Sequence, residues 1–117
     1  PARSGAVLFH CTTGKDRTGW AAALILSLLG ASQDTIYGDY LLTNEDLAPA
    51  TQPVLDHAAA AGVDPDLLRP VLGVDQSYLD TAFATLHATY GSLEGYLSQG
   101  LGLDQDVVSA LRLRFVG

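Results

Sequence analysis

The chain has 117 residues, and its 6 lysines and arginines against 13 aspartates and glutamates give a formal net charge of −7. This length is sufficient for one domain with a hydrophobic core. The acidic balance argues against nucleic acid and against anionic membrane surfaces as partners. A single cysteine excludes an internal disulfide and predicts a reducing, cytoplasmic location. No stretch of the sequence is long and apolar enough to predict a membrane span.

The first predicted element is a β-strand over residues 6–10, and it is the only strand that the sequence indicates. Residues 6–9 read Ala-Val-Leu-Phe, which is typical of a parallel strand buried on both faces. Because one strand with two unpaired edges is unstable in water, its neighbours must come from outside the chain. We therefore interpret residues 1–117 as the C-terminal part of a single domain. Its missing N-terminal half, or a second copy of the chain, would complete the sheet.

The start of the chain agrees with this interpretation, because it begins at Pro1 and contains no methionine. A leader peptide ahead of Pro1 would make the protein secreted, and the sequence leaves that alternative to a cytoplasmic location open. The isolated chain is expected to be inactive or nearly so, since part of the pocket wall would be missing.

Residues 10–19 read HCTTGKDRTG and join a cysteine to a basic loop and the start of a helix. The loop is predicted over residues 11–17. Five residues between Cys11 and Arg17 are enough to curl the backbone so that its N–H groups point inward, and the following helix adds its positive N-terminal end. Such a loop binds an oxyanion. The same dipoles stabilise a thiolate, so we expect a low pKa for Cys11 and a nucleophilic sulfur at neutral pH.

The charged and hydroxyl side chains of this loop suggest distinct tasks. Arg17 presents a planar fork of donors that matches two phosphoryl oxygens. Thr18 can donate its hydroxyl to the thiolate, and Lys15 adds a second positive charge at the rim. Asp16 would repel a phosphate dianion, so its expected task is proton transfer to the leaving oxygen and then from water. The alternative is a solvent-facing carboxylate that only tunes its basic neighbours.

The other loop residues are expected to shape the site. Gly14 allows a positive φ or a close approach to a ligand, and Gly19 allows tight packing where the helix begins. His10 is expected to hold the loop through backbone hydrogen bonds rather than to act as an acid or base. The predicted phosphate-binding set is Thr12, Thr13, Gly14, Lys15 and Arg17.

The rest of the chain is predicted to be helical from residue 18 onward. An apolar helix over residues 18–29 ends at Gly30. Ser32 can cap a second helix that runs to about residue 42. The later predicted starts are Thr43 or Asn44 for a helix that ends near residues 61–62, Asp64-Pro65 for a short helical turn, and Asp75, Ser92 and Asp104 for the last three helices.

The segment from His10-Cys11 through Arg17-Thr18-Gly19 resembles the signature of the cysteine-dependent protein tyrosine and dual-specificity phosphatases. Residues 14–19, GKDRTG, are similar to those of the bacterial branch of atypical tyrosine phosphatases, which also act on phosphoinositides. The similarity covers essentially the whole chain, since it continues at residues 39–45, 78–79, 90–97 and 101–103.

This resemblance implies an α/β phosphatase fold, of which the chain would be the mostly helical C-terminal portion with one parallel-type strand leading into the loop. It implies that Cys11 is the nucleophile, that Arg17 binds phosphate and that Asp16 is the acid. Lys15 stands where lipid-directed relatives keep a lysine. Thr12 stands where the tumour-suppressor phosphoinositide phosphatase has a further lysine, which weighs against a lipid substrate.

The expected reaction is phosphoester hydrolysis through a cysteinyl-phosphate intermediate. The expected substrates are proteins phosphorylated on tyrosine, serine or threonine, small phosphoesters and phosphoinositides. No cofactor is expected, and no metal site, because His57 and His87 have no ligand partners at a useful spacing.

Two other classes of protein use similar loops. A non-catalytic module would hold phosphate or a phosphoinositide without turnover, and the joint presence of Cys11, Arg17 and Thr18 disfavours it. A thiol-redox enzyme such as an arsenate reductase needs further cysteines to resolve its intermediate, and this chain has none. A sulfurtransferase usually lacks the Arg-Thr-Gly sequence that follows the loop here.

Overall fold

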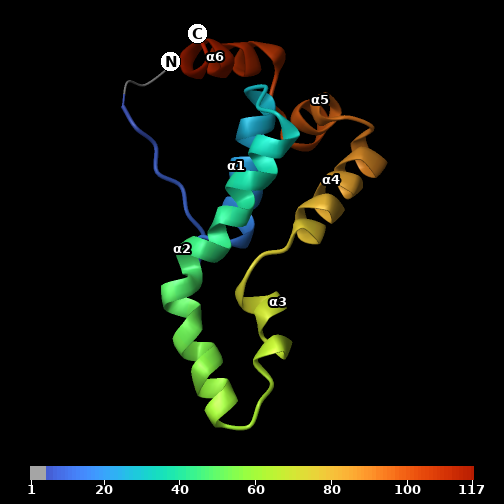
Figure 1. Ribbon diagram of the computed structural model, residues 1–117. Helices are drawn as coiled ribbons and strands as arrows, with labels where there is room; N and C mark the ends of the chain where they lie inside the picture. The colour runs from blue at the N-terminus through green and yellow to red at the C-terminus, as the bar shows by residue number, and fades with distance from the viewer. Residues whose placement is uncertain (1–4) are drawn as a thin grey trace.

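The computed structural model describes residues 5–117 and shows an elongated arrangement of helices (Figure 1). The radius of gyration is 17.2 Å, against about 13 Å for a compact domain of this length. In chain order the elements are α1 (Asp16–Leu28), α2 (Gln33–Ala60), the 3-10 turn η1 (Pro65–Leu67), α3 (Arg69–Leu72), α4 (Gln76–Tyr90), α5 (Leu93–Gly95), the π-helical turn η2 (Tyr96–Gly100) and α6 (Gln105–Phe115).

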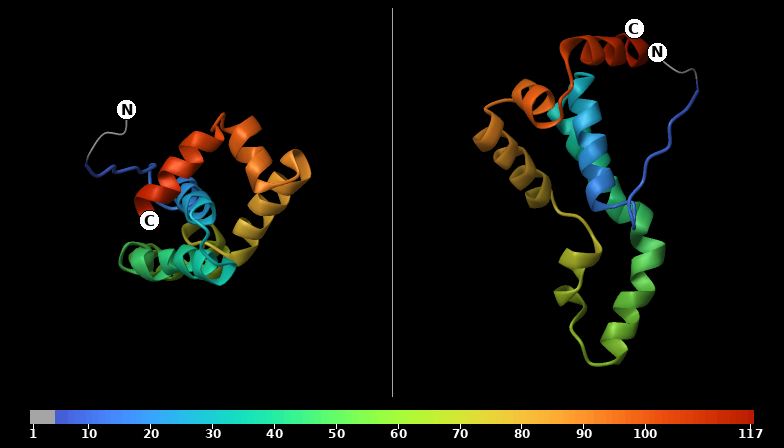
Figure 2. Two further views of the ribbon diagram at one scale, coloured as in Figure 1. Left: turned by 90° about the horizontal axis from the view of Figure 1, so that it is seen from above. Right: turned by 180° about the vertical axis from the view of Figure 1, so that it is seen from behind.

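The expected strand over residues 6–10 is wrong, because the part of the chain that the structure describes contains no β-strand. Residues 6–10 have no regular secondary structure and run outside the helices toward the start of α1 (Figure 2). Val7 is 87% exposed and Leu8 is 90% exposed. The physical reason is that a strand exists only through hydrogen bonds to a neighbouring strand, and residues 5–117 supply none.

The first long helices differ from the prediction in two respects. Helix α1 begins at Asp16, two residues earlier than expected, so Asp16 and Arg17 belong to the helix rather than to the loop. Helix α1 ends within one residue of its expected end, and Gly30 beyond it has a φ of +87°. Ser32 caps α2 by accepting a hydrogen bond from the Thr35 N–H at 3.2 Å. The expected break near Thr43 or Asn44 is wrong, because α2 continues as one helix of 28 residues. Asn44 does not cap its own helix, since its side-chain amide bonds to the backbone of Val74 instead.

The later helix starts are confirmed by their caps. Each predicted cap residue accepts a hydrogen bond from a backbone N–H in the first turn, as an exposed helix end requires. These bonds join Asp64 to Asp66 N–H at 3.0 Å, Asp75 to Ser77 at 2.9 Å, Ser92 to Gly95 at 3.0 Å and Asp104 to Val107 at 2.9 Å.

Two apolar clusters hold the helices and thereby place the start of α1. Helix α1 and the first half of α2 lie side by side and antiparallel, and α4 packs beside them (Figures 1 and 2). Helices α1 and α2 pack closely at Gly19 of α1, where a Cβ would lie 3.1 Å from the ring of Tyr40 on α2. The first cluster consists of Ala23, Ile36, Tyr40, Val74 and Leu79, and the second consists of Leu28, Leu97 and Val108.

The second half of α2 extends beyond α1, and the chain from η1 to the start of α4 returns beside it (Figure 1). This return brings the segment of residues 70–74 next to the N-terminus of α1. Over the described residues, none of the helices combines the length and apolarity that crossing a membrane requires.

Candidate active site

The candidate site is the loop that leads from Cys11 into the N-terminus of α1. Residues 12–15 bend tightly, and Gly14 adopts a φ of +68°, a left-handed conformation that favours glycine. Asp16 is the first residue of α1, so the free N–H groups of the first helical turn face the loop. The local sequence thus supplies both the bend and a positive helix end.

Cys11 is half-buried at the base of this loop, and its thiol is free. The Thr18 hydroxyl, the backbone N–H of Thr18, and then those of Lys15 and Gly14 lower the pKa of Cys11 from 9.0 to about 6, although partial burial of the sulfur acts in the opposite direction. A lowered pKa increases the fraction of Cys11 that is thiolate at neutral pH, and the thiolate is the nucleophilic form of the side chain.

The Thr18 hydroxyl is placed to serve this thiolate. Its oxygen is buried and has no hydrogen-bond partner of normal geometry among the described residues. A buried hydroxyl without a partner is unfavourable. Its proton is consequently free to turn toward the Cys11 sulfur when that sulfur is charged.

Arg17 folds back across the loop. Its Nη2 donates a hydrogen bond to the Thr12 hydroxyl at 3.2 Å, five residues earlier in the chain. Both residues are exposed, so the other guanidinium donors remain open to an oxyanion in the loop. The first residue after Cys11 and the second residue of α1 are thereby joined.

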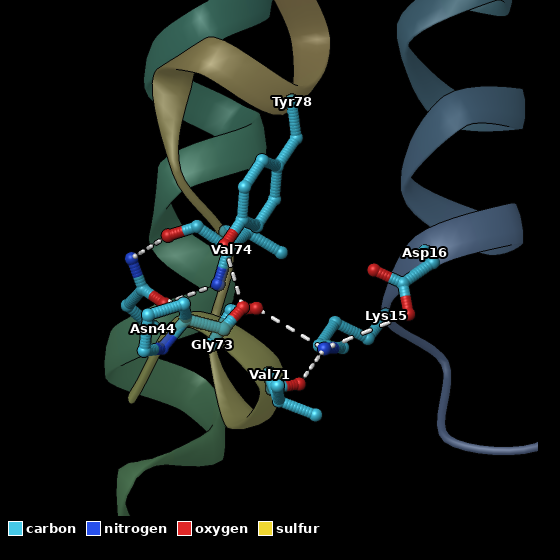
Figure 3. Close-up of polar contacts among 8 residues, drawn as sticks. Lys15, Asp16, Asn44, Val71, Gly73, Val74 and Tyr78 are labelled. Carbon is cyan, nitrogen blue, oxygen red and sulfur yellow. Dashed lines mark hydrogen bonds and ion pairs between the residues drawn. The ribbon is translucent and has the colours of Figure 1, made fainter. Parts of the chain in front are cut away.

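The Lys15 side chain does not lie at the rim of the loop, where the sequence placed it. The residue is buried, with 8% exposure, and its ammonium donates to the backbone oxygens of Val71 at 2.5 Å and Gly73 at 3.1 Å (Figure 3). The Lys15 Nζ also lies 3.5 Å from the Asp16 carboxylate. Its side chain thus points into the junction between α1 and residues 71–73.

Asp16 has an exposed carboxylate, with 65% of its side chain accessible. It lines a small cavity of about 160 Å³ together with Trp20, Tyr40 and Tyr78. Within the described residues no hydrogen bond or ion pair connects it to Cys11. Its carboxylate is therefore open to solvent and has the Lys15 ammonium as its ion-pair partner.

The structure also describes the other residues that the sequence singled out. His10 has its Nδ1 3.1 Å from the Cys11 backbone oxygen. The Thr13 side chain is exposed at the outer edge of the loop. His57 and His87 lie on α2 and α4, and residues 5–117 contain no group of three or more histidine, cysteine or acidic side chains arranged to hold a metal.

Asn44 and Tyr78 are the residues that the sequence did not indicate for this region. Both bind the backbone of residues 70–74, which carries the acceptors for Lys15. The only signal was Asn44 itself, because asparagine is a poor residue for a helix interior unless its side chain has a partner elsewhere.

The chain belongs to the tyrosine phosphatase family, whose sequence model matches residues 2–117. Among its relatives is a protein of Cupriavidus necator whose name places it with the tyrosine-protein phosphatases, 45% identical over 98 residues, or 84% of this chain and 36% of that protein. The triple specificity protein phosphatase PtpB of Mycobacterium tuberculosis is 37% identical over 118 residues, or 91% of this chain and 42% of PtpB.

A tyrosine-protein phosphatase of Nostoc commune is 35% identical over 119 residues, which cover 96% of this chain and 40% of that relative. The chain thus spans about two fifths of the length of these curated relatives.

Proposed function

We propose that the protein hydrolyses phosphoesters through a phosphorylated intermediate on Cys11. The observation that carries this proposal is the Cys11 thiol with a pKa of about 6 at the base of a loop closed by Arg17. A stable thiolate and a forked cation on one short loop match the attacking and stabilising groups of phosphoryl transfer. Membership of the tyrosine phosphatase family supports the same chemistry.

The proposed first step forms a sulfur–phosphorus bond as the bond from phosphorus to the leaving oxygen breaks. The Cys11 thiolate supplies the electron pair, and Asp16 protonates the leaving oxygen. Arg17 binds two equatorial oxygens, while the backbone N–H groups of Thr12, Thr13 and Gly14 receive the remaining charge.

In the second step water attacks phosphorus and Asp16 accepts a proton from it. The sulfur–phosphorus bond breaks, inorganic phosphate leaves, and the thiolate returns to the hydrogen bond of Thr18. The solvent exposure of the Asp16 carboxylate supports this role, since both transfers need a carboxyl group that substrate and water can reach. If Asp16 served only as a charge partner of Lys15, the leaving oxygen would have to be protonated by solvent.

The proposed substrates are phosphotyrosine, phosphoserine and phosphothreonine side chains and small phosphoesters, in the cytoplasm. PtpB is named for triple specificity, which supports a broad range. The sequence argument for phosphoinositide substrates requires the Lys15 charge at the rim of the loop. The ammonium is bound to Val71 and Gly73, so phosphorylated side chains are the substrates that the geometry favours.

The direct test is Cys11→Ser in the purified protein, with hydrolysis of a phosphotyrosine peptide and binding of vanadate measured side by side. We expect turnover to vanish while vanadate still binds. Substantial turnover by Cys11→Ser would exclude the covalent route. Wild-type protein that binds vanadate but hydrolyses no phosphoester, tested with the domain's N-terminal half present, would favour the non-catalytic binding module.

A further inference from the structure

We propose that Lys15 is a positioning residue that fastens the phosphate-binding loop to the segment of residues 70–74, rather than a residue that contacts substrate. Any effect of Lys15 on the kinetics of phosphoester hydrolysis rests on the proposed function, whereas its effect on the Cys11 thiol does not. Figure 3 draws the hydrogen bonds that join Lys15, Asn44 and Tyr78 to this segment.

The ammonium of Lys15 is fully engaged by its own protein. A lysine ammonium carries three N–H donors. Two donate to the backbone oxygens of Val71 and Gly73, and the third side of the ammonium faces the Asp16 carboxylate at 3.5 Å. The Lys15 side chain is 11% exposed. A buried cation with this many acceptors is held in place, because movement away from them would leave both the charge and the carbonyl oxygens buried without partners.

The segment that receives Lys15 is itself fixed from two helices. From α2, the Asn44 amide donates to the Val74 backbone oxygen at 2.9 Å and accepts from the Val74 N–H at 2.8 Å. From α4, the Tyr78 hydroxyl donates to the Pro70 backbone oxygen at 2.6 Å. Val74 is buried in the first apolar cluster. Lys15 is therefore bound to a rigid support rather than to a free loop.

Gly73 shows how closely this support is fitted. A Cβ at that position would lie 2.6 Å from the Asn44 side-chain oxygen, closer than atoms can approach without displacement. The absence of a side chain at Gly73 lets Asn44 and Lys15 reach adjacent backbone groups. The segment thus accepts one polar side chain from α2 and one from the start of α1.

Anchoring the Lys15 side chain also orients its backbone. Lys15 is the residue immediately before α1, and its backbone N–H is one of the groups directed at the Cys11 sulfur. When the ammonium is fixed on Val71 and Gly73, that N–H keeps its direction without a substrate present. This is preorganisation of a thiolate site by a distant support.

The test measures the Cys11 thiol without turnover, through the rate of its alkylation by iodoacetamide as a function of pH. We expect Lys15→Met to raise the apparent thiol pKa and to slow alkylation at pH 6.5 by about threefold or more. Asn44→Ala should change the same quantity in the same direction and by less. Asn44 is neutral and does not contact Cys11, so its effect cannot come from a lost charge.

The matched control is Arg69→Met, which removes a positive charge from α3 next to the same segment. The Arg69 side chain is exposed and pairs only with Asp66 among the described residues, so alkylation should keep its wild-type pH profile. Circular dichroism of each variant establishes that the helices persist. If Lys15→Met does not fold, Asn44→Ala alone decides the test.

An unchanged alkylation profile in a folded Lys15→Met or Asn44→Ala variant would overturn the proposal. So would a Lys15→Met variant with a normal thiol and a selective loss on phosphoinositides, since that result assigns Lys15 to substrate. The proposed function fails by a different result, namely turnover by Cys11→Ser. Alkylation of Cys11 can still report on Lys15 in that case.

Discussion

The guanidinium of Arg17 donates a hydrogen bond to the hydroxyl of Thr12 at 3.2 Å, and this bond closes the loop that begins at Cys11. Arg17 thereby lies against the residue that follows Cys11, and a guanidinium group offers a planar pair of donors to a tetrahedral anion.

The first prediction follows from the geometry of this fork. Arg17→Lys keeps the charge but cannot bind two oxygens in one plane. We expect kcat/KM for a phosphotyrosine peptide to fall on the order of 10²-fold or more. Arg69→Lys is the control, because Arg69 lies outside the loop and should tolerate the change. Wild-type kinetics in Arg17→Lys would show that Arg17 does not bind the phosphoryl group.

A second prediction concerns pH. Because the pKa of Cys11 is about 6, activity should rise through that pH as the thiolate forms and should be lost below it. Thr18→Val removes the hydroxyl that lowers this pKa most, so the acid limb should move upward by about one to two pH units. Thr18→Ser restores a hydroxyl and should bring the limb back. The pH dependence of kcat/KM measures both variants.

Asp16 gives a third prediction, which separates its two proposed roles. If Asp16 protonates the leaving oxygen, Asp16→Asn should slow hydrolysis of phosphoserine peptides far more than that of aryl phosphates with acidic leaving groups. The rates of both substrates in wild type and variant measure this ratio. Equal losses on the two substrates would leave Asp16 as a charge partner of Lys15.

The fourth prediction tests the close fit at Gly73 through stability. Gly73→Ala places a Cβ against the Asn44 side chain, so we expect it to reduce the free energy of unfolding by roughly 1–3 kcal/mol. Gly38→Ala on α2 is the matched control, because its Cβ meets nothing within 4 Å. That change should instead add up to about 1 kcal/mol through helix propensity. Urea unfolding followed by circular dichroism measures both.

A fifth prediction concerns residues 6–10. Val7 and Leu8 are almost fully exposed in the structure, and an apolar run of this kind is normally covered. We expect the 117-residue chain alone to have little activity, and a longer protein that also contains the N-terminal half that we propose for this domain to have much more. Full activity of the purified 117-residue chain as a monomer would contradict this expectation.

The local rules predicted most of the helices, since cap residues act within one turn of their own position. Ser32, Asp75 and Asp104 each bond to an N–H two or three residues ahead. The strand over residues 6–10 failed because strands depend on partners distant in sequence. The break at Asn44 failed for a related reason, as its side chain bonds to Val74, 30 residues away.

The composition of the candidate site could be read from residues 10–19, because the loop is contiguous in the chain. The orientation of its side chains could not be read in the same way. Lys15 was expected at the rim, where a cation would meet phosphate, but it reaches Val71, 56 residues further along. The Lys15 ammonium can bind either backbone carbonyl groups or a substrate. Which of these it binds depends on where α2, α3 and α4 place residues 70–74.

If Cys11 carries the phosphoryl group during turnover, rapid acid quenching should trap it there. The protein is mixed with a phosphotyrosine peptide, quenched within the first turnover and digested, and the peptide that contains Cys11 is examined by mass spectrometry. We predict a phosphoryl adduct on Cys11 that forms early, decays as phosphate is released, and is absent from Cys11→Ser. Turnover with no adduct on Cys11 at any quench time, or with an adduct on another residue, would show that Cys11 does not carry the phosphoryl group.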